Sequence, residues 1–473
     1  MRAIKNFFLL LISEGLSYIL NFLTTVYLAR ILKVTEFGKI NFAFAFFAFS
    51  SIFTNLGLLS VGTRDIAQFQ VSIPKKSEAQ YIINLLSLRL LIALVVFGVL
   101  SIISRIIPSS LEIKTLIVLY GLSLFPLSLS LEWVFLGWEK AGYIMSSKIV
   151  TAVSYFLLTI TLIKDPTAIN RIPLFFFLSN LLGAGFLLIT YLQHNITPNI
   201  NFEFTIWLKD WMQLIKTALP FGLGALLVQF SLNFNVIFLG FVKNSTEVGF
   251  YSASFKVLTF LLIFDRVINN TTLPIISRYA QLGEEKLLFL INKINKLIFI
   301  IGLPLAAIVL VLNRELILFI YGENYLRSAQ IIQVLIWFLL ITMLNSIFTT
   351  VVIAQNEQRI YITTMIQGLI ANLILNLILV PLLGALGSAI VLVTQELIIL
   401  SLFYIKTKII TSLKIYWQNL YKPLMAASLM TIFMFLLKKF NFVLIIGLAL
   451  LFYLGILVII KGITKKDFLL QET

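Results

Sequence analysis

Two positively charged residues stand on one face of a long apolar segment, near residues 249 to 274. A charge inside a membrane-spanning helix costs about 2.5 to 3.5 kcal/mol, so such a residue generally faces a polar cavity or a charged partner. On a straight helix Lys256 and Arg266 would share a polar stripe with Ser252 and Thr259, about 15 Å apart along the axis. Arginine holds phosphate oxygens through two N–H groups, so this spacing suits an extended anionic ligand. The alternative is that both cations pair with acids on neighbouring helices and lock the bundle.

Other polar residues in apolar segments are candidates for lining the same cavity. Glu14 and Asn21 share one helical face of the first segment with Ser17 and Thr24. Glu14 could take up a proton or a sodium ion, or pair with a nearby cation, and the sequence leaves both open.

Later segments hold further polar residues. Arg89 and Glu132 lie in the predicted cytoplasmic halves of their segments, where they could pair, and Glu396 lies near mid-span. Asn372 and Asn376 are four residues apart, which is typical of interhelical hydrogen bonds. The predicted residues are, for binding an anionic substrate, Lys256, Arg266 and Arg89 and, for lining the cavity or coupling to an ion, Glu14, Asn21, Glu132 and Glu396.

No pattern of catalytic residues accompanies these charges. The chain lacks a GxxxxGK[ST] phosphate loop, has no cysteine, and has one histidine, His194, in a predicted cytoplasmic loop. We therefore predict no catalytic residue, no metal site and no enzyme activity.

The composition of the chain indicates which structural elements carry these residues. Hydrophobic residues make up 60% of the 473 and charged residues 12%, which is typical of a protein that crosses the membrane many times. We predict an all-α protein with about 14 transmembrane helices, or 12 if the last pair does not span. Predicted cytoplasmic segments hold 22 Lys and Arg against 12 outside, which indicates that both termini are cytoplasmic. The net charge of +16 therefore reflects topology and anionic lipids, not nucleic acid.

The chain contains two similar stretches, 21–46 and 233–257. Each runs from an Asn-Phe pair through an apolar helix to a short turn, TEFG (Thr35 to Gly38) or TEVG (Thr246 to Gly249), 211 residues apart. Chance similarity between apolar helices is the alternative. A weaker pair around Glu139 and Glu357, 218 residues apart, supports the repeat. A parallel repeat predicts two six-helix lobes related by a pseudo-two-fold axis along the membrane normal.

The repeat divides the chain into four parts. They are an N-terminal lobe (1–200, helices 1 to 6), an amphipathic interfacial linker helix (201–216), a C-terminal lobe (217–410, helices 7 to 12), and two additional helices with a cytoplasmic tail (411–473). The longest predicted loops, 64–80 and 277–296, are cytoplasmic. A membrane enzyme that handles lipid-linked sugars would need a larger outer region than this chain offers.

Several motifs resemble those of a known family. They are LAR (28–30), LGLLSVGTRDIAQ (56–68), LSLEWVFLGWEK (129–140), VGFYSASFKV (248–257), LPIISR (273–278) and NLILNLILVPLLGALGSAI (372–390). Together they resemble the Wzx-type polysaccharide flippases of the multidrug/oligosaccharidyl-lipid/polysaccharide (MOP) superfamily, which has a MATE-like fold. The similarity covers nearly the whole chain.

The resemblance implies a transporter of the bacterial inner membrane. It would move undecaprenyl-pyrophosphate-linked oligosaccharide units from the cytoplasmic to the outer leaflet by alternating access, for O-antigen, capsule or exopolysaccharide synthesis. Lys256 best fits the family's cavity cations and would hold the pyrophosphate with Arg266.

The resemblance also suggests which partners to expect. They are the lipid-linked oligosaccharide, membrane lipids and the polysaccharide polymerase machinery. No cofactor is expected, and the sequence does not choose between H+ and Na+ as a coupling ion. The alternative function is a multidrug/cation antiporter of the same fold, although such a cavity would favour acids over the two cations.

Overall fold

The computed structural model describes residues 2–72, 75–193, 204–355, 357–410, 420–438 and 440–463. Over these ranges the chain forms helices only, and twelve spans are long and apolar enough to cross a membrane. The predicted all-α fold class is confirmed, and the count fits the twelve-helix alternative. His194 and residues 464–473 of the predicted tail lie outside the described residues.

Two long helices of the chain are not among these twelve spans. The first helix of the chain, α1 (Arg2–Ile31), is not counted among the spans, and α17 (Tyr421–Leu436) is an apolar helix of 16 residues. The count of fourteen therefore stays a prediction.

The chain divides into two compact units, Met1–Gly249 and Phe250–Thr473. After α1, the first unit contains α2 (Val34–Asn55), α3 (Leu58–Ser72), α4 (Lys75–Ile106), α5 (Leu111–Gly121), α6 (Leu124–Leu129), α7 (Glu132–Gly137), α8 (Ala141–Leu162), η1 (Pro166–Ala168), α9 (Arg171–Gln193) and α10 (Phe204–Val242). The next helix, α11 (Ser245–Leu261), crosses the boundary.

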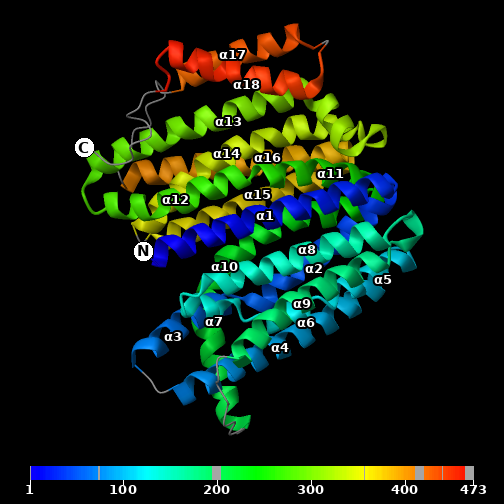
Figure 1. The fold of residues 1–473 in the computed structure, drawn as a ribbon, viewed down its shortest axis with the longest axis vertical. Coiled ribbons are helices and arrows are strands. Elements are labelled where there is room, and N and C mark those ends of the chain that lie inside the picture. Colours follow the sequence, from blue (N-terminus) through cyan, green and yellow to red (C-terminus); the bar gives the residue numbers. More distant parts are fainter. Residues whose placement is uncertain are drawn as a thin grey trace. The chain divides into compact units, whose positions relative to one another are not determined.

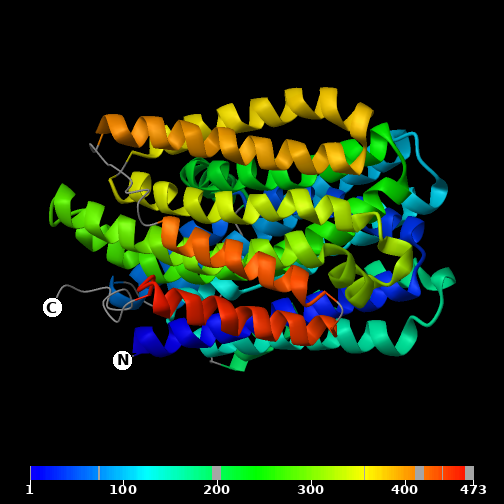
Figure 2. The ribbon, with the colours of Figure 1, turned by 90° about the horizontal axis from the view of Figure 1, so that it is seen from above.

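The second unit continues from α11. It contains α12 (Ile263–Tyr279), α13 (Glu284–Tyr321), η2 (Glu323–Tyr325), α14 (Ser328–Ala354), α15 (Gln358–Leu383), α16 (Ala385–Ile410), α17 and α18 (Phe442–Ile459). Its long helices run side by side in both views (Figures 1 and 2). The pair α17 and α18 packs on α13, where the Tyr453 hydroxyl donates to the Ile300 carbonyl at 3.0 Å.

The boundary of the first unit differs from the predicted division near residues 200 to 216. Helix α10 begins at Phe204 and continues through Pro220 to Val242, so no break separates the predicted linker from the next span. Trp211 is buried, and its indole N–H donates to the Asn84 carbonyl of α4 at 3.2 Å. This contact, and packing of α10 on α2 and α3, join residues 204–242 to the first unit.

Three spans that the sequence predicts as single helices are interrupted. They are Val34–Phe69 (α2 and α3), Leu111–Gly137 (α5, α6 and α7) and Ser245–Tyr279 (α11 and α12). At the first break Leu56 and Gly57 both have positive φ, 30° and 80°, which ends α2. Apolar composition shows that a segment can enter the membrane, but it does not show whether the helix is continuous.

The two longest predicted loops are mostly helical. Helix α3 extends to Ser72 and α4 begins at Lys75, so 64–80 is not an open loop. Likewise α12 extends to Tyr279 and α13 begins at Glu284. Charged residues therefore mark where these helices leave the apolar region, not where they end.

Candidate functional site

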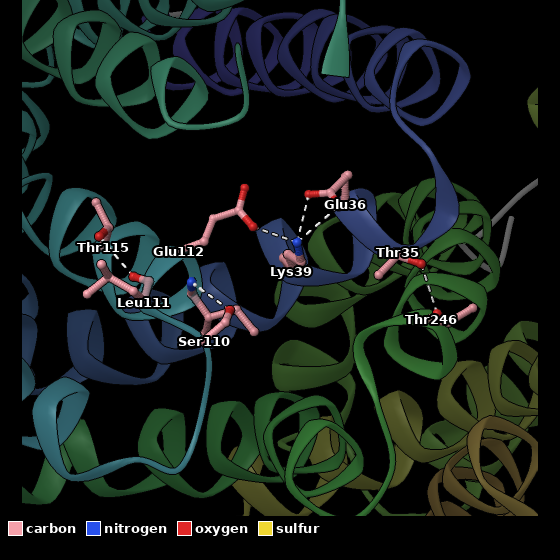
Figure 3. Close-up of polar contacts among 9 residues, drawn as sticks. Thr35, Glu36, Lys39, Ser110, Leu111, Glu112, Thr115 and Thr246 are labelled. Carbon is pink, nitrogen blue, oxygen red and sulfur yellow. Dashed lines mark hydrogen bonds and ion pairs between the residues drawn. The ribbon is translucent and has the colours of Figure 1, made fainter. Parts of the chain in front are cut away.

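The two repeated turns contact each other. The hydroxyls of Thr35 and Thr246 lie 2.9 Å apart, and Figure 3 shows them pointing toward one another from the starts of α2 and α11. These residues are equivalent in the repeat, 211 positions apart. We call residues 35–38 and 246–249 the paired turns.

Glycines allow the paired turns to approach closely. A Cβ on Gly38 would lie 1.7 Å from the Ser245 carbonyl oxygen, and a Cβ on Gly249 would lie 2.3 Å from the Val34 carbonyl oxygen. Gly38 is equivalent to Gly249, and Val34 to Ser245, so the two contacts are reciprocal. Equivalent residues of the predicted repeat therefore meet through equivalent contacts.

Beside the paired turns, a lysine bridges two helices of the first unit. The Lys39 ammonium lies 3.0 Å from a Glu36 carboxylate oxygen and 2.5 Å from one of Glu112, at the start of α5 (Figure 3). Ser110 caps α5 by accepting from the Ile113 N–H at 3.4 Å. In the second copy Phe250 occupies the position of Lys39, so this ion-pair network belongs to one copy only.

Arg89 is buried in α4, only 1% exposed. Its guanidinium donates to the carbonyls of Leu127 and Ser130, at 2.8 Å each, and to the Asn55 side chain at 3.3 Å. These acceptors lie at the ends of α6 and α2, where helix breaks leave polar groups without helical partners. Arg89 therefore joins two interrupted spans, and Glu132 is its acidic neighbour.

The predicted candidates of the first helix lie apart from Arg89. Glu14 lies 3.5 Å from the Lys148 ammonium of α8, which fits the alternative that Glu14 pairs with a nearby cation. Asn21 is exposed, and its carbonyl accepts from the Thr25 hydroxyl at 2.9 Å.

Lys256 lies on α11 and Arg266 on α12, within one membrane span. The break between the two helices is slight, because Leu262 keeps a right-handed helical backbone and its N–H donates to the Leu258 carbonyl at 2.9 Å. Lys256 is half-buried, whereas Arg266 is exposed. The shared polar stripe and the role of both cations in binding therefore stay predictions.

Glu396 belongs to a group of polar contacts within the second unit. The Asn345 amide of α14 donates to the Glu396 carboxylate at 2.8 Å, and the adjacent Ser346 hydroxyl donates to Asp265 of α12 at 2.7 Å. One turn further along, the Thr350 hydroxyl donates to Asn269 at 3.0 Å. We call these six residues the α12–α14–α16 cluster.

The cluster holds two carboxylates, those of Asp265 and Glu396, that interact electrostatically with each other. Among the residues that the structure describes, neither carboxylate forms an ion pair. Carboxylate, amide and hydroxyl oxygens are suited to a proton or a hard cation. No group of three or more acidic, histidine or cysteine side chains suited to a metal occurs in the described part of the chain.

Of the six residues in this cluster, only Glu396 is predicted from the sequence as a site residue. Asp265 and Asn269 are four residues apart on α12, and their partners Ser346 and Thr350 are four apart on α14. The equal spacing of polar residues on two apolar helices is a pattern in the sequence that predicts contact between those helices.

Comparison with known proteins agrees with the fold and extends the sequence evidence. A family model described as "Polysaccharide biosynthesis protein" matches residues 3–280. A protein of Shigella dysenteriae named as an O-antigen transporter is 26% identical over 410 residues, which cover 84% of this chain and 98% of that protein. A protein of the same name from Escherichia coli K12 is 22% identical, over 84% and 95% of the two chains.

Solved structures show the same fold. A structure of the lipid II flippase MurJ in an inward closed conformation covers 95% of this chain and 98% of its own, with a TM-score of 0.78 and 14% identity. An inward-facing MATE family transporter of the MOP superfamily covers 84% and 94%, with a TM-score of 0.68 and 16% identity. The MOP-superfamily fold expected from the sequence is confirmed.

Proposed function

Because this chain belongs to the polysaccharide biosynthesis protein family, we propose that it is a flippase for lipid-linked oligosaccharides. It would move undecaprenyl-pyrophosphate-linked repeat units from the cytoplasmic to the outer leaflet of the bacterial inner membrane, for surface polysaccharide synthesis. The observation that best supports this is similarity to the O-antigen transporters along nearly their whole length. Both termini would be cytoplasmic, and the polymerase machinery would receive the product.

The physical chemistry of the cargo agrees with the proposal. A charged sugar-pyrophosphate head group cannot cross hydrocarbon unaided, whereas a polyprenyl tail can stay in the lipid. The protein must supply a polar, partly cationic path for the head group. Lys256, half-buried in a membrane span, remains our first candidate for holding the pyrophosphate. The likeness to MATE transporters bears on the fold alone and does not favour drug transport.

Deleting the gene tests the cargo directly. We expect an undecaprenyl-pyrophosphate-linked oligosaccharide to accumulate in the cytoplasmic leaflet, and its sugars would identify the repeat unit. Unchanged lipid-linked intermediates and normal surface polysaccharide in the deletion strain would refute the proposal.

A second prediction concerns Lys256 and Arg266. The double variant Lys256→Gln, Arg266→Gln should reach the membrane but expose at least tenfold less lipid-linked sugar on the outer leaflet, because a charge-assisted phosphate contact contributes about 1.5 to 3 kcal/mol. Sugar exposure is measured by lectin or enzymatic labelling of intact spheroplasts. The control is Arg64→Gln with Lys164→Gln, which removes the same charges at exposed positions. Normal exposure in the test variant would remove both residues from the site.

We also propose that the α12–α14–α16 cluster binds the coupling ion, H+ or Na+. The carboxylates of Asp265 and Glu396 support this, because the contacts shown for them are with the neutral side chains of Ser346 and Asn345. In vesicles with an imposed gradient, Asp265→Asn or Glu396→Gln should abolish stimulation of flipping by that gradient while the protein stays folded. The control is Glu14→Gln, whose carboxylate pairs with Lys148. Undiminished stimulation in both cluster variants would exclude the cluster.

A further inference from the structure

The second unit contains a cavity between α13, α14 and α16 that none of the proposed transport residues line. Its volume is about 170 Å3. Its walls are mainly apolar and aromatic, with Phe299 from α13, Phe348 from α14 and Tyr404 from α16. Leu344, Leu400 and the polar residues Asn295 and Ser401 complete the lining.

Asn295 is the unusual member of this lining. It is 3% exposed, and within the described part of the chain neither its amide nitrogen nor its amide oxygen has a hydrogen-bond partner. Asn292, one turn earlier on α13, donates instead to the Leu288 carbonyl at 2.9 Å. A buried polar group without a hydrogen-bond partner lowers the stability of the folded protein by about 1 to 3 kcal/mol. A bound molecule that hydrogen-bonds to the Asn295 amide would remove this cost.

The cavity lies next to a face of α16 that is open to its surroundings. Ser401 is exposed, and Leu397 and Ile405, one turn on either side, are 46% and 55% exposed. In a membrane span an exposed apolar face is in contact with lipid. A molecule dissolved in the bilayer can therefore reach the cavity without passing through water.

The volume of the cavity and the residues that line it limit which ligands can bind. An apolar cavity of about 150 Å3 accommodates a molecule such as benzene. The Asn295 amide adds one donor and one acceptor at the wall. A ligand with an apolar body of one ring and a single hydroxyl or carboxamide would match both features.

We propose that this cavity binds a small neutral molecule of that class, which enters from the bilayer and hydrogen-bonds to the Asn295 amide. The site lies within one unit and does not depend on the proposed transport function. A bound molecule would contact α13, α14 and α16 together and would stabilise their packing. The same chemistry is found in phenols and in aromatic carboxamides that dissolve in membranes.

The test compares 4-fluorophenol with 4-fluorotoluene, which has a similar shape but no hydroxyl. Fluorine NMR measures binding of each probe to the full chain in nanodiscs, where partition into lipid is the same for every variant. We expect saturable 4-fluorophenol binding, weakened roughly fivefold or more by Asn295→Leu, with 4-fluorotoluene binding undiminished. Asn292→Leu is the matched control on the same helix and should leave 4-fluorophenol binding unchanged.

Two further measurements test whether the probes bind in this cavity and whether the Asn295 amide lowers the stability of the ligand-free protein. Leu344→Trp adds a bulky ring to the cavity lining and should reduce binding of both probes at least tenfold. Asn295→Leu should raise the melting temperature of the ligand-free protein, because it removes a buried amide that has no protein partner. The proposal is overturned if 4-fluorophenol does not saturate, if its affinity is equal in wild type and Asn295→Leu, or if Asn295→Leu lowers the melting temperature.

Discussion

Arg89 shows how one buried side chain can hold two interrupted helices in place. Its guanidinium donates to carbonyls at the end of α6 and to Asn55 at the end of α2. In a membrane, backbone carbonyls released by a helix break find no water, so a protein donor must satisfy them. We predicted a role for Arg89 in binding the substrate anion, but these contacts favour a role in positioning the helices.

The positioning role predicts a loss of stability. Arg89→Met should lower the free energy of unfolding by about 3 kcal/mol or more, because it leaves several buried acceptors unsatisfied. Thermal denaturation in detergent measures this loss. Arg64→Met is the control, since Arg64 is half exposed and pairs with Asp65 at the surface, and it should cost under about 1 kcal/mol. Equal melting temperatures for wild type and Arg89→Met would contradict the positioning role.

At the scale of elements, the crossing of α2 and α11 depends on having no side chain at two positions. Gly38 and Gly249 each face a backbone carbonyl of the other turn, closer than a Cβ can approach. The repeated glycine of TEFG and TEVG is therefore explained by helix packing. This explanation is independent of the cargo.

Substituting either glycine should separate the helices. We expect Gly38→Val to lower the melting temperature strongly, with a cost of about 3 kcal/mol or more, because backbone atoms must move to accommodate the side chain. Gly98→Ala on α4 is the control: a Cβ there meets nothing within 4 Å, so the change should be neutral or stabilise by up to about 1 kcal/mol. A tolerated Gly38→Val would show that the turns do not pack this closely.

At the scale of the whole molecule, the paired turns give a way to test alternating access. The chain has no cysteine, and the Thr35 and Thr246 hydroxyls are 2.9 Å apart, so cysteines placed there are within reach of a disulfide. If the predicted lobes rock apart at these turns during transport, oxidised Thr35→Cys, Thr246→Cys should stop flipping and dithiothreitol should restore it. Each single cysteine variant serves as a control. Full transport by the cross-linked protein would show that the turns stay together throughout the cycle.

Several features of the protein were determined by the sequence alone. Long apolar segments can be stable only in lipid, so composition predicted a helical membrane protein, and the motifs predicted its superfamily. The repeat pairs TEFG with TEVG, and the structure places both segments in the first turns of helices, α2 and α11. Asn372 was predicted to form interhelical hydrogen bonds, and its amide donates to Gln395 of α16 at 2.6 Å. These inferences rely on local composition and spacing, which do not require knowledge of neighbouring helices.

Only the tertiary structure decided which polar residues meet. Helical periodicity fixes the angle between side chains along one continuous helix, but it carries no information about an interruption such as that at Leu56 and Gly57. It also does not show which helix lies opposite. The sequence therefore predicts Arg89 as an anion ligand, whereas in the structure its guanidinium donates to backbone carbonyls. The contact between Asp265 and Ser346 likewise depends on how α14 packs against α12. A charged side chain inside a membrane needs a polar or charged partner. Which residue becomes that partner depends on how segments distant in the sequence pack together.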